Sequence, residues 1–262
     1  MDTPPASSST LLCLAGQVAV VTGASGGIGR AIALELAKNG ADVVLHAYQR
    51  REAAESIGTE IRRLGREATV LQADLSQPES RGLFFEAAKG WRDRIDIWIN
   101  AAGADVLTGA RAGWSFDQKL ATLWQVDCLA TIALSRMTGQ HMKERGFGVI
   151  LNVGWDQAEQ GMAGESGEMF AAVKGAVMAF TRSLAQSLAP AVRVNCLAPG
   201  WIRTAWGEQA SKYWQQRAVR QSLRGRWGTP EDVARAAVFF ASPAADFITG
   251  QVIPINGGFR HE

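Results

Sequence analysis

Residues Thr22–Arg30 read TGASGGIGR, and this stretch decides the fold of the chain. It follows a β-branched run, Val18–Thr22, and opens a segment, Ile28–Asn39, whose apolar residues recur with helical spacing. Glycines at such a junction allow a tight turn, let backbone N–H groups approach a pyrophosphate, and let the helix pack closely on the strand. The order of strand, turn and helix therefore predicts a dinucleotide-binding cradle.

The same alternation of short strands and longer helices continues along the chain. Strands are predicted at Val18–Thr22, Asp42–Leu45, Ala68–Gln72, Ile95–Asn100, Gly148–Val153, Val192–Leu197 and Val252–Ile255. Several of these are apolar on consecutive residues, as strands covered on both faces are. Alternating strands and crossover helices predict an α/β fold: a single Rossmann-type, doubly wound parallel sheet of about seven strands, with helices on both faces.

Helix start and stop signals agree with this pattern. Glycines at positions 40 and 65 end the predicted helices Ile28–Asn39 and Arg51–Leu64. Ser76 with Glu79 predicts a capping box at the start of a helix that runs to Gly90. A second start is predicted at Thr229–Asp232 (TPED), which supplies a cap, an N1 proline and two acids.

Length and composition favour one domain. The chain has 262 residues, of which 47% are hydrophobic and 20% charged, and it contains no linker or repeat. We expect residues 1–14 to form a disordered N-terminal tail. Residues 15–262 are expected to form a single dinucleotide-binding domain, with a substrate lid around residues 203–225.

Charge and cysteine usage argue against several classes of protein. The net charge is only +2 and no basic block stands out, so no nucleic-acid partner is expected. No apolar run reaches about 18 residues, and Leu11–Ala15 is too short for a secretory segment, so no membrane association is expected. Cys13, Cys128 and Cys196 lack CxxC spacing, which disfavours disulfides and a metal site. A cytoplasmic protein is the resulting expectation.

The segment after the second strand, His46–Arg51, indicates which dinucleotide binds. An NAD site usually places an acid here for the ribose 2′-hydroxyl, but this chain has none before Glu52. Arg50 or Arg51, with Arg30 across the cradle, would balance a 2′-phosphate. The alternative is that these arginines are solvated at the start of a helix. The sequence favours NADP(H) over NAD(H).

The motifs together resemble the short-chain dehydrogenase/reductase family, closest in layout to its 3-oxoacyl-carrier-protein-reductase-like branch. The resemblance covers about residues 15–260. Its landmarks are the Thr22–Gly29 loop, Asp74-Leu75, Asn100-Ala101-Ala102-Gly103, Asn195, Pro199–Thr204 and the C-terminal Thr249-Gly250-Gln251 and Asn256-Gly257-Gly258.

The resemblance implies a role for each matching position. Asp74 would meet the adenine, Ala102-Gly103 the adenosine ribose, Lys174 the nicotinamide ribose and Pro199–Thr204 the carboxamide side of the nicotinamide. The expected cofactor-binding residues are Gly23, Ser25, Gly26, Gly27, Ile28, Gly29, Arg30, Arg50, Asp74, Leu75, Asn100, Ala101, Ala102, Gly103, Lys174, Pro199, Gly200, Ile202 and Thr204. The resemblance also implies a small-molecule substrate and a homotetramer, with one interface formed by Phe239–Gly258.

The chain departs from the family at three of four catalytic positions. Only the lysine, Lys174, is kept; Phe170 stands at the tyrosine position and Asp127 at the asparagine position. Trp155 stands at the serine position, although the loop is about two residues longer than usual, so Gln157 is an alternative. A phenyl ring has no acidic proton to donate to a substrate oxygen.

Carboxyl groups near the site are candidates to replace the missing proton donor. Asp127 is expected near Lys174, and Asp156 follows Trp155 directly. A carboxyl buried between aromatic rings has its pKa raised towards the range of a general acid. The alternatives are that Asp127 simply pairs with Lys174 and that the loop acids, Asp156, Glu159, Glu165 and Glu168, are solvated. The candidate catalytic residues are Lys174, Asp127 and Asp156.

Aromatic residues give a second indication of function. Trp155, Trp201, Trp206 and Trp214 lie in segments that surround the substrate pocket in the family. They would stack on a flat ligand, or they would pack a lid shut on the pocket. We therefore expect an NADP(H)-dependent oxidoreductase with a non-standard proton donor, acting on a flat or conjugated carbonyl or enone. The alternative is a catalytically silent NADP(H)-binding protein, either a sensor or a subunit of a hetero-oligomer.

Overall fold

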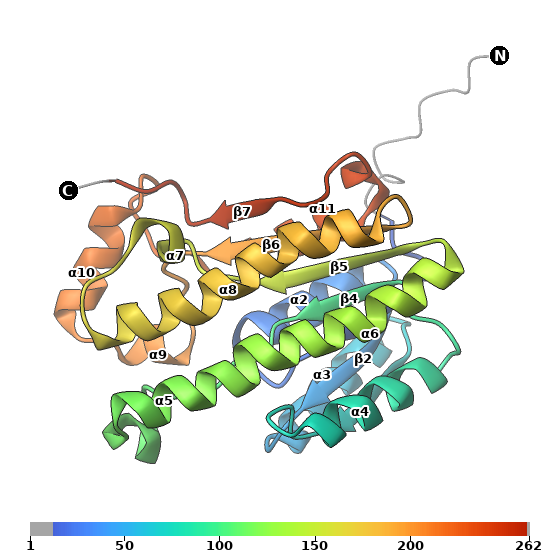
Figure 1. The fold of residues 1–262 in the computed structure, drawn as a ribbon, viewed down its shortest axis with the longest axis horizontal. Coiled ribbons are helices and arrows are strands. Elements are labelled where there is room, and N and C mark those ends of the chain that lie inside the picture. Colours follow the sequence, from blue (N-terminus) through green and yellow to red (C-terminus); the bar gives the residue numbers. More distant parts are fainter. Residues whose placement is uncertain (1–12, 261–262) are drawn as a thin grey trace.

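Seven parallel strands form one sheet in the computed structural model, which describes residues 13–260 (Figure 1). Their order is β3-β2-β1-β4-β5-β6-β7. The strands are β1 (Val18–Val21), β2 (Asp42–Ala47), β3 (Ala68–Gln72), β4 (Ile97–Asn100), β5 (Gly148–Val153), β6 (Val192–Pro199) and β7 (Val252–Ile255). The predicted doubly wound α/β fold is confirmed.

Helices cover both faces of the sheet. One layer holds α2, α3 and α11, and the other holds α4, α6 and α8 (Figure 1). The α-helices are α2 (Gly27–Lys38), α3 (Arg51–Arg63), α4 (Pro78–Gly90), α5 (Phe116–Leu123), α6 (Ala130–Arg145), α7 (Gln157–Gln160), α8 (Glu165–Leu188), α9 (Ala205–Gln209), α10 (Lys212–Gln221) and α11 (Pro230–Ala241). A π-helical turn, η2 (Trp124–Leu129), joins α5 to α6.

Neighbouring residues of the central strands enter two different cores. Val21 and Ile99 pack on the side of α2 and α11, whereas Val20 and Trp98 pack on the side of α4 and α6. All four side chains are fully buried. Burial of one such side chain contributes about 1.5–3 kcal/mol, so the strands form a rigid platform for the loops at their ends.

The strand order reverses between β1 and β4, which are neighbours although β2 and β3 lie between them in the chain. Loops leave to opposite faces at such a switch point and create a crevice at the carboxyl ends of the strands. Those ends point towards α9 and α10 in Figure 1. The crevice therefore lies between the cradle and the segment predicted to be a lid.

One helix start differs from the prediction. Helix α4 begins at Pro78 with Gln77 as its N-cap and no side-chain cap, so the capping box at Ser76 and Glu79 is wrong. Proline at N1 lacks only an N–H that a helix leaves unpaired anyway, and Ser76 N instead donates to Asp74 Oδ1 at 2.9 Å. The predicted helix start at Thr229 is confirmed, and the structure adds a capping box between Thr229 and Asp232.

The domain begins slightly earlier than predicted. Leu14, which the sequence assigned to the tail, is fully buried, and its N–H donates to Asn39 O at 2.8 Å. Residues 1–12 of the predicted tail lie outside the described residues, as do residues 261–262. Within residues 13–260, none of the helices is long and apolar enough to cross a bilayer.

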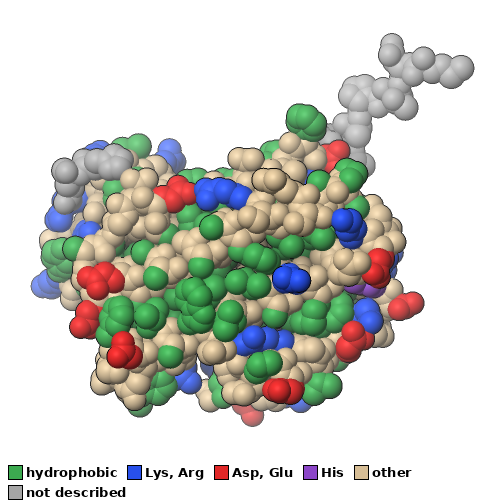
Figure 2. All heavy atoms as spheres, in the orientation of Figure 1, with side chains coloured by type: hydrophobic (Ala, Val, Ile, Leu, Met, Phe, Trp, Pro, Cys, Tyr) green, Lys and Arg blue, Asp and Glu red, His purple; other side chains and the backbone are tan. Residues whose placement is uncertain are grey.

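The face shown in Figure 2 carries hydrophobic side chains gathered in the band between α6 and α8. Phe170 and Phe180 on α8, together with Ile132 on α6, are only partly buried. The helix that carries Lys174 therefore also presents an apolar surface.

Candidate active site

The first glycine of the cradle is held by a histidine. Gly23 N donates to His46 Nδ1 at 3.1 Å, and His46 Nε2 lies 3.1 Å from Ala73 O. Burial lowers the pKa of His46 to about 4. The ring is therefore neutral near pH 7, accepts at Nδ1 and donates its Nε2 proton to Ala73, which ties the cradle to the ends of β2 and β3.

The cradle glycines are required by close backbone contacts. A Cβ at position 23 would lie 2.7 Å from Ala102 Cα, and Gly23 has a φ of +68°. A Cβ at position 29 would overlap Gly23 O. Thr22 Oγ1 accepts from both Ala101 N and Ala102 N at 3.0 Å. The loops after β1 and β4 thus form one unit whose shape fits the backbone approach that a pyrophosphate needs.

Arg50 is the arginine that reaches the cradle. A Cβ on Gly26 would lie 2.9 Å from Arg50 Nη2. The two other candidates are paired elsewhere: Arg30 with Glu60 at 3.2 Å, and Arg51 with Glu55 at 3.6 Å. The sequence left these arginines as alternatives, and the structure places only Arg50 against the glycine loop.

The other predicted cofactor contacts come from loops at the same edge of the sheet. Thr204 closes over the cradle, since its Cγ2 would lie 3.7 Å from a Cβ on Gly27. Asp74 is half-buried after β3, and Leu75, Pro199 and Ile202 are buried. Residues from the ends of β1, β2, β3, β4 and β6 are thereby brought to one edge.

Asn100 is the exception among these positions. Its side chain is buried beneath the site, where Nδ2 donates to Ser135 Oγ and to Asn152 Oδ1, both at 2.8 Å. Asn100 Oδ1 accepts from Trp98 Nε1 at 2.8 Å. Asn152 Nδ2 in turn donates to Thr181 Oγ1 at 2.9 Å. The Asn100 side chain therefore links β4, β5, α6 and α8 and leaves only its backbone for a cofactor.

Lys174 and Asp127 form a nearly buried ion pair. Lys174 Nζ lies 3.0 Å from Asp127 Oδ2 and donates to Val153 O at 3.2 Å. Asp127 Oδ1 accepts from Ala104 N at 2.8 Å. The expected proximity of the two residues is confirmed. An ammonium has three N–H donors, so Lys174 keeps one for a ribose hydroxyl.

Aromatic rings occupy the positions of the missing serine and tyrosine. The rings of Trp155 and Phe170 meet edge to face, with centroids 6.1 Å apart and planes at 64°. Gln157, the alternative at the serine position, is 1% exposed, and its Nε2 has no hydrogen-bond partner among the described residues. No hydroxyl is supplied by any of the three.

Asp156 is buried at the ends of β5 and β6. Asn256 Nδ2 donates to Asp156 Oδ2 at 3.0 Å, and that oxygen would lie 2.9 Å from a Cβ on Gly200. Its other oxygen, Oδ1, is buried without a hydrogen-bond partner in the part of the chain that the structure describes. Burial raises the pKa of Asp156 to about 6, against the opposing effect of the Asn256 hydrogen bond.

The remaining loop acids differ from Asp156. Glu159, Glu165 and Glu168 are exposed, and Glu159 pairs with Arg182 at 2.9 Å. The prediction that the loop acids are solvated is therefore correct for these three and wrong for Asp156.

The lid tryptophans pack on one another. Trp201, Trp206, Trp214 and Trp227 form a four-indole cluster, with ring centroids 5.5–6.4 Å apart in five of its pairs. The Arg217 guanidinium lies over the rings of Trp201 and Trp214, at 5.9 and 5.2 Å from their centroids. Three of the tryptophans expected around the pocket, Trp201, Trp206 and Trp214, thus contact one another, whereas Trp155 contacts Phe170.

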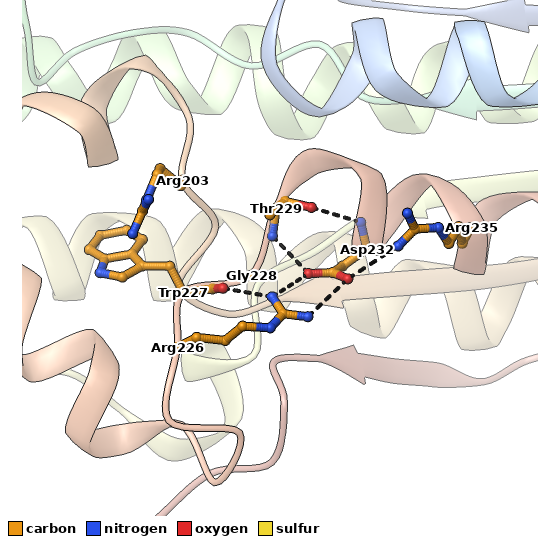
Figure 3. A pocket seen from close by; sticks show the side chains of 7 residues that line it. All are labelled: Arg203, Arg226, Trp227, Gly228, Thr229, Asp232 and Arg235. Carbon is orange, nitrogen blue, oxygen red and sulfur yellow. Dashed lines mark hydrogen bonds and ion pairs between the residues drawn. The ribbon is translucent and has the colours of Figure 1, made fainter.

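A groove of about 490 Å³ opens beside this cluster, with Trp227 in its lining. Figure 3 shows its lining residues: Arg203, Arg226, Trp227, Gly228, Thr229, Asp232 and Arg235. Asp232 takes 2.7 and 3.2 Å hydrogen bonds from Arg226 and lies 3.5 Å from Arg235. Of the nicotinamide loop and the predicted lid, only Arg203 lines it, and Lys174, Asp127 and Asp156 do not, so it is a poor candidate for the catalytic centre.

Three residues have a supporting role that was not assigned to them from the sequence. Thr22 and His46 hold the cradle, and Asn256 holds Asp156. Thr22 adjoins the glycine loop and was within reach of sequence reasoning, whereas the Asn256–Asp156 contact joins residues 100 positions apart. Among the described residues, no group of three or more His, Cys, Asp or Glu side chains is arranged to hold a metal ion.

Comparison with known proteins agrees with this geometry. The enoyl-(acyl carrier protein) reductase family matches residues 23–260. A cyclohexanol dehydrogenase from Rhodococcus sp. (strain TK6) is 36% identical, with 95% of this chain and 98% of that protein covered. A 3-oxoacyl-(acyl-carrier-protein) reductase from Aquifex aeolicus (strain VF5) is 34% identical, with 94% and 98% covered.

A solved structure shares the fold over nearly the whole chain. The 3-oxoacyl (acyl-carrier-protein) reductase from Agrobacterium tumefaciens C58, crystallised with NADP bound, superposes with a TM-score of 0.86 and 29% identity, covering 96% of this chain and 97% of that one. The cradle, the Lys174 position and these relatives together show that the chain belongs to the short-chain dehydrogenase/reductase family and is an oxidoreductase of that type.

Proposed function

We propose that this protein is an NADP(H)-dependent oxidoreductase in which Asp156 replaces tyrosine as the source of the proton. The observation that carries the proposal is the buried Asp156 carboxyl, which lies against Gly200 and has one oxygen without a hydrogen-bond partner in residues 13–260. The substrate is a flat or conjugated carbonyl or enone, whose reduction requires one hydride and one proton.

Preference for the phosphorylated cofactor rests on Arg50. Its guanidinium lies against Gly26, and no acid follows β2 before Glu52. An arginine at this place supplies charge-assisted hydrogen bonds to a 2′-phosphate, whereas NAD sites place a carboxylate there. The solved reductase from Agrobacterium tumefaciens also has NADP bound.

The roles of the two carboxyl groups follow from their surroundings. Asp127 accepts from the Lys174 ammonium and from a backbone N–H, contacts that suit an ionised carboxylate with no proton to give. Asp156 has a pKa of about 6, so about half of the molecules carry its proton at pH 6 and about a tenth do at pH 7. A bound nicotinamide dinucleotide supplies the hydride; Lys174 orients the ribose and Asp156 delivers the proton.

The test is an NADPH-oxidation screen over matched carbonyl and enone substrates. Asp156→Asn keeps the size of the side chain but removes its proton, so kcat should fall about 10²–10⁴-fold with NADPH affinity unchanged. For the wild type, kcat should decrease as pH rises above about 6, because the protonated acid is lost. The exposed Glu165→Gln is the control. Full activity of Asp156→Asn on a substrate that wild type reduces would refute the role of Asp156.

A silent dinucleotide-binding protein is the second candidate, and the Trp155–Phe170 contact favours it. These rings fill the places of the catalytic hydroxyls, and the lid indoles pack on one another. Wild type that binds NADPH but reduces no compound, combined with activity gained by the Phe170→Tyr and Trp155→Ser double variant, would support this candidate over the enzyme.

A further inference from the structure

The lid is richer in basic than in acidic residues. Residues 203–226 contain six lysines and arginines and a single acid, Glu208, whereas the whole chain has a net charge of only +2. A positively charged lid raises the local concentration of anions and lowers that of cations. The charge of the lid therefore favours the entry of anionic substrates.

Arg217 is the partly buried cation of the lid, whereas Arg203, Lys212, Arg220 and Arg224 are exposed. It lies on the inner side of α10, half-buried, where its neighbours along the helix face are Trp214, Ala218 and Gln221. The guanidinium contacts the ring of Trp201, which directly follows Gly200 of the loop expected to contact the nicotinamide. The positive charge of Arg217 is therefore held against Trp201, which belongs to that loop.

Among the described residues, Arg217 has no salt-bridge partner. Within residues 13–260, no carboxylate lies within 4 Å of its guanidinium, which lies over the rings of Trp201 and Trp214. Arg226 on the same segment is instead bonded to Asp232 in the groove of Figure 3. Guanidinium carries five N–H donors arranged to take a carboxylate or phosphate in a fork, and the flanking rings restrict its orientation.

We infer that Arg217 is the anchor for an anionic group on the substrate, a carboxylate or a phosphate ester, and that Trp201 and Trp214 support it. The substrate is then a flat molecule with the reducible bond at one end and an anion at the other. This inference rests on the proposed function, because it takes the inner face of the lid to meet the substrate.

The experiment measures binding instead of turnover. Benzoate, phenyl phosphate and the neutral isostere benzamide are titrated by calorimetry into the protein saturated with NADP⁺, and indole fluorescence is followed in parallel. Charge-assisted hydrogen bonds should make benzoate or phenyl phosphate bind about ten- to a hundredfold more tightly than benzamide, with a change in fluorescence. Whichever of benzoate and phenyl phosphate binds more tightly shows whether the substrate group is a carboxylate or a phosphate ester.

Three variants locate the effect. Arg217→Met should bind the anions and benzamide equally, while Arg217→Lys, which keeps the charge but not the fork, should retain part of the preference. Lys212→Gln removes one charge from the exposed side of the same helix and should keep the full preference. Thermal melts establish that each variant is folded, and the lysine variant tests the inference even where the methionine variant unfolds.

The outcomes separate this inference from the proposed function. Equal binding of benzoate, phenyl phosphate and benzamide by wild type, or a preference unchanged in Arg217→Met, would overturn the anchor even where the protein reduces neutral enones. An anion preference that depends on Arg217, in a protein that oxidises NADPH with no compound, would support the anchor while contradicting the oxidoreductase proposal.

Discussion

Lys174 Nζ lies 3.0 Å from Asp127 Oδ2, and the two side chains are only 12% and 3% exposed. Asp127 also accepts from Ala104 N, next to the loop expected to hold the adenosine ribose. The π-helical turn η2 carries Asp127 between α5 and α6, while α8 carries Lys174. The pair therefore joins the cofactor loop to the helix of the candidate catalytic lysine, and it stabilises the site as well as shaping it.

Removal of Asp127 from the ion pair should show how much the pair contributes to stability. Asp127→Ala leaves the Lys174 ammonium buried without a counter-charge, so the free energy of unfolding should fall by about 3 kcal/mol. Urea denaturation measures it. Glu144→Ala, at an exposed position on α6, should change stability by less than about 0.5 kcal/mol. Equal effects of the two variants would show that the ion pair contributes little.

Arg50 should determine the choice of cofactor. Arg50→Ala should weaken NADPH binding about ten- to a hundredfold, the range for a lost charge-assisted hydrogen bond, and leave NADH binding unchanged. Arg51→Ala is the matched control, since Arg51 pairs with Glu55. Calorimetric titration of both nucleotides decides the matter, and wild type that binds NADH as tightly as NADPH would contradict the assignment.

Gly23 should tolerate no side chain. Gly23→Ala places a Cβ 2.7 Å from Ala102 Cα at a φ of +68°, so we expect loss of NADPH binding and destabilisation by more than about 2 kcal/mol. Gly65→Ala has a similar φ of +75° but open space around it, and should cost about 1 kcal/mol from the backbone alone. Matching melting temperatures for the two variants would exclude the backbone contact as the cause.

Asp156 should make stability depend on pH. Its folded-state pKa of about 6 exceeds the ordinary value near 3.8, so the native state binds the proton more tightly and loses stability as pH rises from about 4 to 6. The cost above pH 6 is roughly 2–3 kcal/mol. Asp156→Asn removes this cost, so the variant should gain stability relative to wild type over that interval. If the free energies of unfolding of wild type and Asp156→Asn, measured by urea denaturation, change in parallel between pH 4 and 7, the Asp156 pKa lies near its ordinary value.

Assembly is expected to involve the C-terminal segment. We predict a homotetramer with Phe239–Gly258 in one interface, and Phe247 in this segment has its side chain fully exposed in the single chain. Light scattering should give four times the 28.1 kDa chain mass, and Phe247→Asp should reduce it. Leu83→Asp on α4, at another exposed apolar position, is the control. A monomer at micromolar concentration would contradict the prediction.

Local chemistry was enough to predict the architecture from the sequence. The predicted strands Ala68–Gln72, Gly148–Val153 and Val252–Ile255 match those of the structure, and the others differ by one or two residues at their ends. Consecutive apolar residues, glycine stops and the Thr229 cap all act over a few positions, so they can be recognised without knowledge of distant contacts. The misplaced start at Ser76 is of the same kind, because two local signals competed there and Pro78 prevailed.

The catalytic site shows where that reasoning ends. The sequence by itself established that Phe170 and Trp155 lack the usual hydroxyls, since this depends on residue identity alone. Which arginine reaches the cradle, which acid is buried and whether the tryptophans meet one another depend on side chains from separate elements. Arg50 is distinguished from Arg51 by its contact with Gly26, and Asp156 from Glu159 by burial beside Asn256. Tertiary packing decided which arginine and which acid belong to the site, because desolvation and charge pairing depend on neighbours that are distant in the chain. Asn256 and Asp156, for example, are 100 residues apart.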